Sequence, residues 1–156
     1  MFLPQKANSD RPFYKGGQMI RHIQPKAVPE STAPFSQVVI DDTYAHFAGL
    51  VAADFPEGQA VLGDVGEETR IVLTAIRSML EEIGLDMDRI VQTIVHFASL
   101  EDFDTMDNVY QEFFEHGHYP ARTTTESPRP VSYTHLRAHE TLGSISYAVF
   151  CLKKGG

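Results

Sequence analysis

The chain has 156 residues, of which 42% are hydrophobic and 22% are charged, and its formal net charge is −8 at pH 7. This length suits one domain with a single hydrophobic core, and the acidity argues against nucleic-acid backbones and anionic membranes as partners, because both are bound by clustered lysine and arginine. No apolar run approaches the roughly 20 residues of a membrane-spanning helix, and no apolar signal segment is visible, so we expect a cytoplasmic protein.

Residues 1–18 differ in pattern from the rest of the chain. They are polar, aperiodic and interrupted by Pro4 and Pro12, which is typical either of a disordered leader or of upstream sequence translated in frame, with Met19 as the true start. A strand-like pattern begins just after Met19, so we expect the folded domain to occupy residues 19–129. The sequence shows no internal repeat and no second domain.

A hairpin is predicted in the next segment. Gln37–Ile40 is a short apolar stretch, the pair Asp41-Asp42 is a turn signal, and residues 44–51 resume with aromatic and aliphatic side chains. Residues 55–58, with the sequence Phe-Pro-Glu-Gly, have the composition of a loop.

From Asp64 to Ile83 the apolar residues follow a helical period. Gly84 is well placed to end this helix in a left-handed conformation. The predicted buried stripe consists of Val72, Ile76, Met79 and Ile83, widened by Leu73 and Leu80.

In the second half of the domain, the sequence pattern predicts a strand, then a helix, then another strand. Residues 89–98 are rich in β-branched side chains and form a strand, and Ser99 offers a hydroxyl that can accept a bond from an early helical amide. The following helix, ending near Glu115, buries Phe103, Met106, Tyr110 and Phe113, and after a loop at 116–120 residues 121–126 form a strand. The order β-β-α-β-α-β predicts an α+β fold, a mixed sheet with both helices on one face.

Arg122 is the strongest candidate for a residue that binds a ligand or takes part in catalysis. A guanidinium holds a carboxylate through two parallel hydrogen bonds, which suits recognition of a small organic acid. An arginine at a strand start is also a common surface or ion-pair residue, and Glu126 would share its sheet face and could pair with it. His116 and His118 have metal-compatible spacing but lack a third ligand nearby, so we expect no metal and no cofactor.

Four short blocks of sequence form a specific combination. They are Pro34-Phe35-Ser36-Gln37, Phe47-Ala48-Gly49, residues 103–114 and Pro120-Ala121-Arg122-Thr123. Together they resemble the reactive-intermediate deaminase family, RidA, also called YjgF-like. The resemblance covers residues 19–129 and implies a chorismate-mutase-like (ferredoxin-like) subunit that assembles as a homotrimer, with a cleft at each subunit interface.

The same resemblance implies a chemistry. Arg122 would bind the carboxylate of a 2-imino acid, derived from an enamine such as 2-aminoacrylate, while water attacks the imine carbon and releases ammonia and a 2-keto acid. Phe35 and Gly49 would line the cleft. Asp107 matches a position that is commonly asparagine in the family, and Thr124 one that is commonly cysteine. The expected ligand is therefore a small carboxylate-bearing imine or keto acid.

Three departures from the family pattern suggest a divergent subgroup. Leu50 stands where many members have glutamine, Phe35 lacks a tyrosine hydroxyl, and Asp107 is negative where a neutral amide is usual. They keep open the alternative of a non-catalytic small-ligand-binding or interaction module of the same fold. An amidohydrolase-like activity on a different acyl substrate is a third reading.

Residues 131–156 resemble a translated sequencing adapter. Val131–Thr141 is similar to one frame of a transposon end with its read primer, and Ile145–Gly156 to a flow-cell adapter in the same frame. We therefore interpret residues 130–156, including Cys151, as a non-native tail. The family's last strand, with a glutamate that positions or protonates the water, would then be missing. We expect an unpaired sheet edge, deaminase activity in the intact parent protein, and low or absent activity in this chain.

Overall fold

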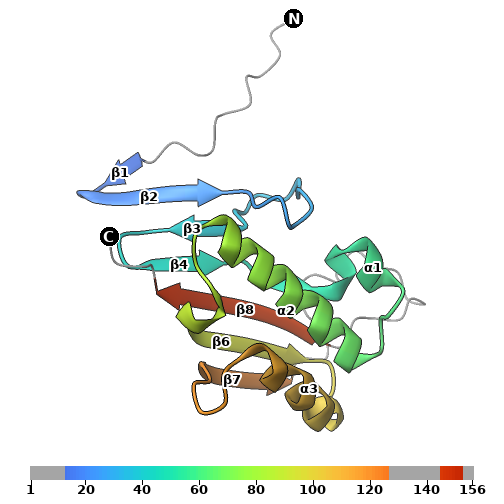
Figure 1. The fold of residues 1–156 in the computed structure, drawn as a ribbon. Coiled ribbons are helices and arrows are strands. Elements are labelled where there is room, and N and C mark those ends of the chain that lie inside the picture. Colours follow the sequence, from blue (N-terminus) through green and yellow to red (C-terminus); the bar gives the residue numbers. More distant parts are fainter. Residues whose placement is uncertain (1–12, 127–144, 153–156) are drawn as a thin grey trace, which may run out of the picture.

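A computed structural model of the chain describes residues 13–126 and 145–152, arranged as one mixed sheet with helices packed against it (Figure 1). The strand order is β1-β2-β3-β4-β8-β6-β7, and β5 also pairs with β8. Only the β6–β7 pair is parallel among the described pairs. The strands are β1 (Phe13–Lys15), β2 (Gln18–Ile23), β3 (Val38–Ile40), β4 (Tyr44–Phe47), β5 (Leu50–Val51), β6 (Ile90–Phe97), β7 (Ala121–Glu126) and β8 (Ile145–Leu152).

Both long helices lie on the same face of this sheet, as predicted (Figure 1). They are α2 (Val65–Glu82) and α3 (Phe103–Tyr110), and the short helix α1 (Pro56–Gln59) precedes them. Single 3₁₀ turns cover 52–54, 87–89, 100–102 and 111–113. No helix in the described part of the chain is both long and apolar enough to cross a membrane.

Helix α2 has the ends and the buried stripe that its sequence predicts. The Asp64 side chain accepts a hydrogen bond from the Glu67 amide at 3.1 Å, and Gly84 takes the left-handed conformation, with φ of 78°. Five residues of the predicted stripe are at most 1% exposed, and Ile83 is partly buried against the same core. The buried five are Val72, Leu73, Ile76, Met79 and Leu80.

The predicted hairpin is confirmed as β3 and β4, with Val38 opposite Phe47 and Ile40 opposite Ala45. Its turn is held by Asp41, whose carboxylate accepts hydrogen bonds from the amides of Thr43 at 2.7 Å and Tyr44 at 2.6 Å. The second predicted strand breaks into β4 and β5, with residues 48 and 49 between them. Residues 56–59 form α1 rather than a loop, because Pro56 can occupy the first helical position.

Residues 13–18, expected to belong to a leader without regular structure, take part in a hairpin instead. β1 pairs with β2 in antiparallel register, with Lys15 opposite Gln18. The two residues between them are Gly16 and Gly17, with φ of 61° and 85°. Two consecutive positive φ values are what a tight two-residue hairpin turn requires, and glycine adopts them without strain. The rest of the predicted leader, residues 1–12, lies outside the described residues.

The expectation of an unpaired sheet edge at the place of the last strand is also wrong. β8 lies between β4 and β6, pairing His46 with Phe150 on one side and Ile94 with Ala148 on the other. The place expected to be left empty by the missing last strand is therefore occupied by residues 145–152, whose backbone pairs with both neighbouring strands. The similarity of residues 131–156 to adapter sequence remains a prediction, and residues 127–144 lie outside the described part.

Strand β6 contains an irregularity that determines which side chains face the helices. The register with β8 shifts between Ile90 and Gln92, so Val91 falls out of the alternation of buried side chains along the strand and is only half-buried. Beyond the shift, Thr93, Val95 and Phe97 are fully buried. Thr93 lies beside Arg122 in the parallel pairing with β7.

Candidate active site

Arg122 lies on β7, with its guanidinium enclosed between the sheet and α3. The side chain is 21% exposed. The guanidinium carbon is 4.9 Å from the centre of the Tyr110 ring and 5.3 Å from the centre of the Phe103 ring. Aromatic faces attract a cation at such distances and restrict its movement, so the guanidinium is held in place.

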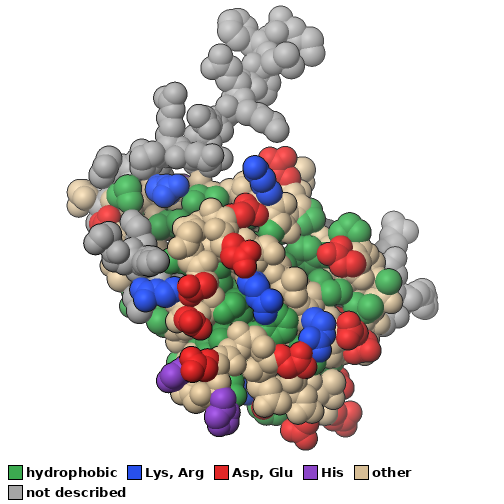
Figure 2. All heavy atoms as spheres, viewed as in Figure 1, with side chains coloured by type: hydrophobic (Ala, Val, Ile, Leu, Met, Phe, Trp, Pro, Cys, Tyr) green, Lys and Arg blue, Asp and Glu red, His purple; other side chains and the backbone are tan. Residues whose placement is uncertain are grey.

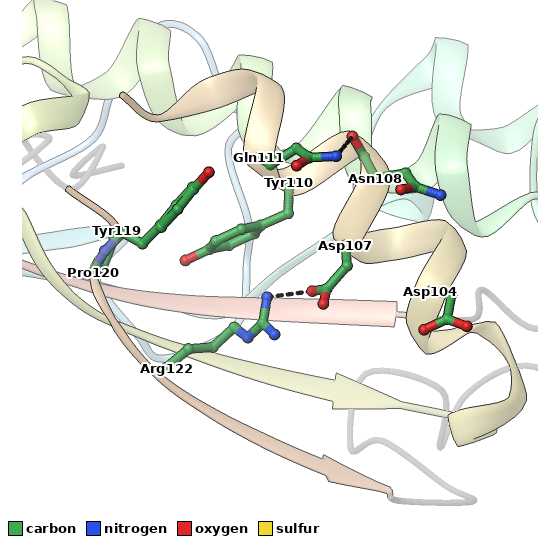
Figure 3. A pocket seen from close by; sticks show the side chains of 8 residues that line it. All are labelled: Asp104, Asp107, Asn108, Tyr110, Gln111, Tyr119, Pro120 and Arg122. Carbon is green, nitrogen blue, oxygen red and sulfur yellow. Dashed lines mark hydrogen bonds and ion pairs between the residues drawn. The ribbon is translucent and has the colours of Figure 1, made fainter. Parts of the chain in front are cut away.

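Asp107 is the acidic partner of Arg122. Its Oδ1 accepts a hydrogen bond of 2.6 Å from Nη1 of Arg122, as Figure 3 shows. Glu126, considered as a partner from the sequence, instead accepts a bond from the amide of Leu100 at 3.1 Å. Within the described residues, the remaining guanidinium nitrogens of Arg122 have no hydrogen-bond partner. One edge of the cation is therefore occupied and another is open.

Tyr110 connects this guanidinium to the core. Its hydroxyl bonds with Oγ1 of Thr93 at 2.9 Å, and the two residues are 4% and 0% exposed. Burial raises the pKa of Tyr110 above its ordinary value, and this effect outweighs the Thr93 hydrogen bond and the charge of Arg122, which both lower it. The phenol therefore stays neutral at physiological pH, with its ring facing Arg122.

An open cavity of about 810 Å³ lies next to these residues. Its lining carries one guanidinium and two carboxylates, so its formal charge is negative. Figure 3 shows Arg122 directed at Asp107, whereas Asp104 points away from the guanidinium. The lining residues are Asp104, Asp107, Asn108, Tyr110, Gln111, Tyr119, Pro120 and Arg122.

Comparison with known proteins identifies the family. Residues 25–129, more than half of the chain, match the family described as Endoribonuclease L-PSP. A human protein named 2-iminobutanoate/2-iminopropanoate deaminase is 32% identical over 102 residues, covering 65% of this chain and 74% of the human protein. The chain belongs to the RidA (YjgF-like) family.

Other members show the same relationship. A RutC family protein of Pyrococcus abyssi is 34% identical over 101 residues, covering 65% of this chain and 79% of that protein. A Rid family protein from Yersinia pestis has a TM-score of 0.73 at 22% identity, covering 86% of this chain and 99% of its own. RidA from the Antarctic bacterium Psychrobacter has a TM-score of 0.70 at 19% identity, covering 85% and 99%. These two structures confirm the predicted RidA fold.

In this RidA-family chain, the cavity contains two of the five predicted site residues, Arg122 and Asp107. Thr124 shares the sheet face of Arg122 but lies further along β7, opposite Val95. Phe35, 51% exposed, precedes β3, and Gly49 lies between β4 and β5. The strands β8 and β6 separate β4 from β7, and neither Phe35 nor Gly49 lines the cavity beside Arg122.

Several cavity residues were not predicted as site residues. The sequence pattern predicts Tyr110 in the buried stripe of a helix and Tyr119 in the loop at 116–120, and it gives Asp104 no role in a site. A signal was present, because Asp104, Asp107, Asn108 and Gln111 have the spacing of one helix face, beside the apolar stripe. That polar face of α3 lines the cavity.

The two loop histidines have partners of another kind. His116 Nδ1 lies 3.3 Å from the Tyr119 hydroxyl, and His118 Nδ1 lies 3.1 Å from the Glu115 carboxylate. Among the described residues, no group of three or more histidine, cysteine, aspartate or glutamate side chains is arranged to hold a metal ion.

At the cavity beside Arg122, the guanidinium can bind an anion, and the carboxylates of Asp104 and Asp107 can exchange protons.

Proposed function

We propose that the protein hydrolyses 2-imino acids to 2-keto acids and ammonia, with Arg122 binding the substrate carboxylate. The observation that carries this proposal is the guanidinium itself. Its side chain is 21% exposed and is held against two aromatic rings, and beside the open cavity it keeps N–H donors that no described residue accepts from. A cation fixed in this way binds a carboxylate strongly, because the hydrogen bonds are charge-assisted and little side-chain freedom is lost.

The reaction balances with water as its only co-reactant. Water adds to the imine carbon, forming a C–O bond, the nitrogen takes up protons, and the C–N bond then breaks to leave ammonia and a keto group. No electron is gained or lost, so no redox cofactor is required. The carboxylates of Asp104 and Asp107 are the acid–base groups in the cavity that can exchange these protons.

The glutamate expected on the family's last strand has no counterpart in β8, whose sequence Ile-Ser-Tyr-Ala-Val-Phe-Cys-Leu contains no acidic residue. One group that could position the reacting water is therefore lacking. A general acid or base contributes about 10²- to 10⁴-fold to a rate. We therefore propose slow turnover in this chain, dependent on Arg122.

We further propose that the site is completed between subunits of a homotrimer. Phe35 is an exposed aromatic side chain on a loop, and Gly49 is also exposed. The segments that carry them lie close together, because the Ala48 amide donates a hydrogen bond to the Gln37 carbonyl at 2.9 Å. Neither Phe35 nor Gly49 lines the cavity around Arg122 of the same subunit. A neighbouring subunit that supplies these two residues would close the open side of that cavity.

RNA is a less suitable ligand despite the description of the family as an endoribonuclease. Binding of a phosphate backbone needs clustered basic side chains. On the helix-covered face shown in Figure 2, the basic side chains are interspersed with acidic ones. The cavity lining also has more carboxylates than guanidinium groups.

A second function is a non-catalytic module that binds small carboxylates. Two observations favour it: Asp107 already occupies one edge of Arg122, and β8 supplies no acid. Under this alternative, the protein binds 2-keto acids and releases no ammonia from imines.

The test compares Arg122→Ala with Arg77→Ala. Arg77 also lies over an aromatic ring, with its guanidinium carbon 4.7 Å from the centre of Phe113, but it does not line the cavity. 2-Imino acids are generated in the assay by an amino-acid oxidase, and release of ammonia above the spontaneous rate is measured. We expect Arg122→Ala to lower kcat/KM about 100-fold or more, the equivalent of about 3 kcal/mol of lost charge-assisted bonds, and Arg77→Ala to leave it unchanged.

Equal rates for wild type and Arg122→Ala would refute the role of Arg122. An absence of any acceleration by the wild type, together with Arg122-dependent binding of 2-ketobutyrate in calorimetry, would select the non-catalytic alternative. The trimer is tested separately by sedimentation, in which a monomer at micromolar concentration would contradict the shared site.

A further inference from the structure

We infer that Asp107 determines the charge of the ligand that this site accepts, favouring a carboxylate that carries a cationic N–H group over a carboxylate that is purely anionic. A protonated 2-imino acid belongs to the first class, and its 2-keto acid product to the second. This inference rests on the proposed function and narrows it to a substrate class.

The contact between Asp107 and Arg122 leaves a defined space for a ligand. Nη1 of Arg122 is occupied by Oδ1 of Asp107 at 2.6 Å, and the other guanidinium nitrogens have no partner within the described residues. A ligand carboxylate must therefore use the remaining edge of the cation. Since a guanidinium is small and planar, that carboxylate then lies a few ångströms from the carboxylate of Asp107.

Electrostatics favours a ligand with two opposite charges at this position. An anion alone gains the attraction of Arg122 but meets the repulsion of Asp107, and the cavity lining as a whole is already negative. A cationic N–H group next to the ligand carboxylate changes that repulsion into attraction, because Asp107 can accept its hydrogen bond. Asp107 is 41% exposed, so a ligand can reach its carboxylate.

The helix dipole does not explain this aspartate. Acidic residues are favoured in the first turn of a helix, and Asp107 is the fifth residue of α3, which begins at Phe103. Asp104 occupies the first turn, and it makes no contact with Arg122 (Figure 3). The geometry therefore links Asp107 to the guanidinium rather than to the helix end.

This arrangement would also assist the reaction. An imine that carries an extra proton has a more electrophilic carbon than a neutral one, and a carboxylate beside the nitrogen stabilises the protonated form. After hydrolysis the keto acid has lost its N–H group, so Asp107 repels the product. Asp107 thus favours substrate over product at the same binding position.

The experiment measures two ligands with the same carbon skeleton, L-2-aminobutyrate, which is zwitterionic, and 2-ketobutyrate, which is anionic. Dissociation constants are determined by calorimetry for the wild type, for Asp107→Asn and for Asp104→Asn. Asp107→Asn keeps the shape of the side chain and removes its charge. Asp104→Asn removes the same charge from the same cavity without touching Arg122.

We expect the wild type to bind 2-aminobutyrate more tightly than 2-ketobutyrate. In Asp107→Asn, the ratio of the two dissociation constants should shift about tenfold or more towards the keto acid, because one charge a few ångströms away is removed from a partly screened site. In Asp104→Asn the shift should stay below about threefold, because that carboxylate is farther from the guanidinium.

An unchanged ratio in Asp107→Asn would overturn the inference, and so would an equal shift in Asp104→Asn, since the cause would then be the total charge of the cavity. Failure of both ligands to bind any of the three proteins would overturn it as well. The ratio does not depend on turnover. If the wild type releases ammonia but the ratio of dissociation constants is unchanged in Asp107→Asn, only this inference is refuted. If the ratio shifts as expected but the wild type releases no ammonia, only the proposed function is refuted.

Discussion

The hydrogen bond between Thr93 and Tyr110 allows a quantitative test of how the site is supported. Tyr110→Phe removes the phenol oxygen and leaves the fully buried Thr93 hydroxyl without this hydrogen-bond partner, which is 2.9 Å away in the wild type. Thr93→Val has the reverse effect on the Tyr110 hydroxyl. A buried polar group left unsatisfied costs about 1–3 kcal/mol, so each single variant should lose this amount of unfolding free energy.

The double variant should lose much less than the sum of the two single losses. Replacing both partners by apolar groups of similar shape removes the unsatisfied group as well as the bond, and such a change is close to neutral. We expect a coupling free energy of about 1–2 kcal/mol between the two positions. In a chain of this length, 1 kcal/mol corresponds to a change in Tm of about 2–4 °C.

The assay is urea denaturation and thermal unfolding of all four proteins at equal concentration, since assembly of subunits makes apparent stability concentration-dependent. Additive losses in the double variant would refute the reasoning. The ring of Tyr110 is kept in Tyr110→Phe, so the aromatic contact with Arg122, 4.9 Å in the wild type, should persist. Binding of 2-ketobutyrate should therefore change less than about threefold, which separates support of the fold from recognition of the ligand.

Two further predictions concern stability outside the site. A Cβ on Gly58 would lie 1.9 Å from the carbonyl oxygen of Ala52, so Gly58→Ala should destabilise the protein by about 3 kcal/mol or more, whereas Gly66→Ala, whose nearest atom would be 3.4 Å away, should stabilise α2 by up to about 1 kcal/mol. The unfolding free energies of Gly58→Ala and Gly66→Ala are measured by urea denaturation, and a similar loss of stability in both variants would contradict this prediction. Hydrogen bonds from two backbone amides lower the pKa of Asp41, so its ionised form contributes stability above about pH 4 that is lost as the pH falls through the folded pKa. The difference in unfolding free energy between wild type and Asp41→Asn should therefore shrink on acidification below pH 4. A difference that grows on acidification would contradict a lowered pKa of Asp41.

The parts of the fold that could be predicted are those in which a long periodic pattern coincides with end signals. Helix α2 is an example, because its apolar stripe, Asp64 and Gly84 all indicate the same boundaries. The β3–β4 hairpin was predictable for a similar reason, since Asp41 marks the turn between two apolar segments. The hairpin of β1 and β2 had an available signal as well, the Gly16-Gly17 pair, which was missed because it lies at the end of a segment interrupted by Pro4 and Pro12.

The arrangement of the site was less predictable, because it depends on how a helix crosses a strand. Arg122 could be selected as a carboxylate-binding residue from its chemistry and from the family pattern. Its actual partner, Asp107, comes from a different element 15 residues earlier in the chain. Glu126 shares the sheet face but bonds to the Leu100 amide, and only the three-dimensional placement of α3 decides between these two acids.

The central position of β8 has a consequence for biosynthesis. β4 and β6 are not paired with each other in the described sheet, so the sheet joins them only through residues 145–152. A nascent chain still lacking this stretch on the ribosome therefore carries two separate ribbons with open inner edges. Such edges can recruit strands from other polypeptides, and closure between residues so distant in sequence is slow. Aggregation during translation should accordingly depend more on how soon β8 is released than on the stability of the finished protein.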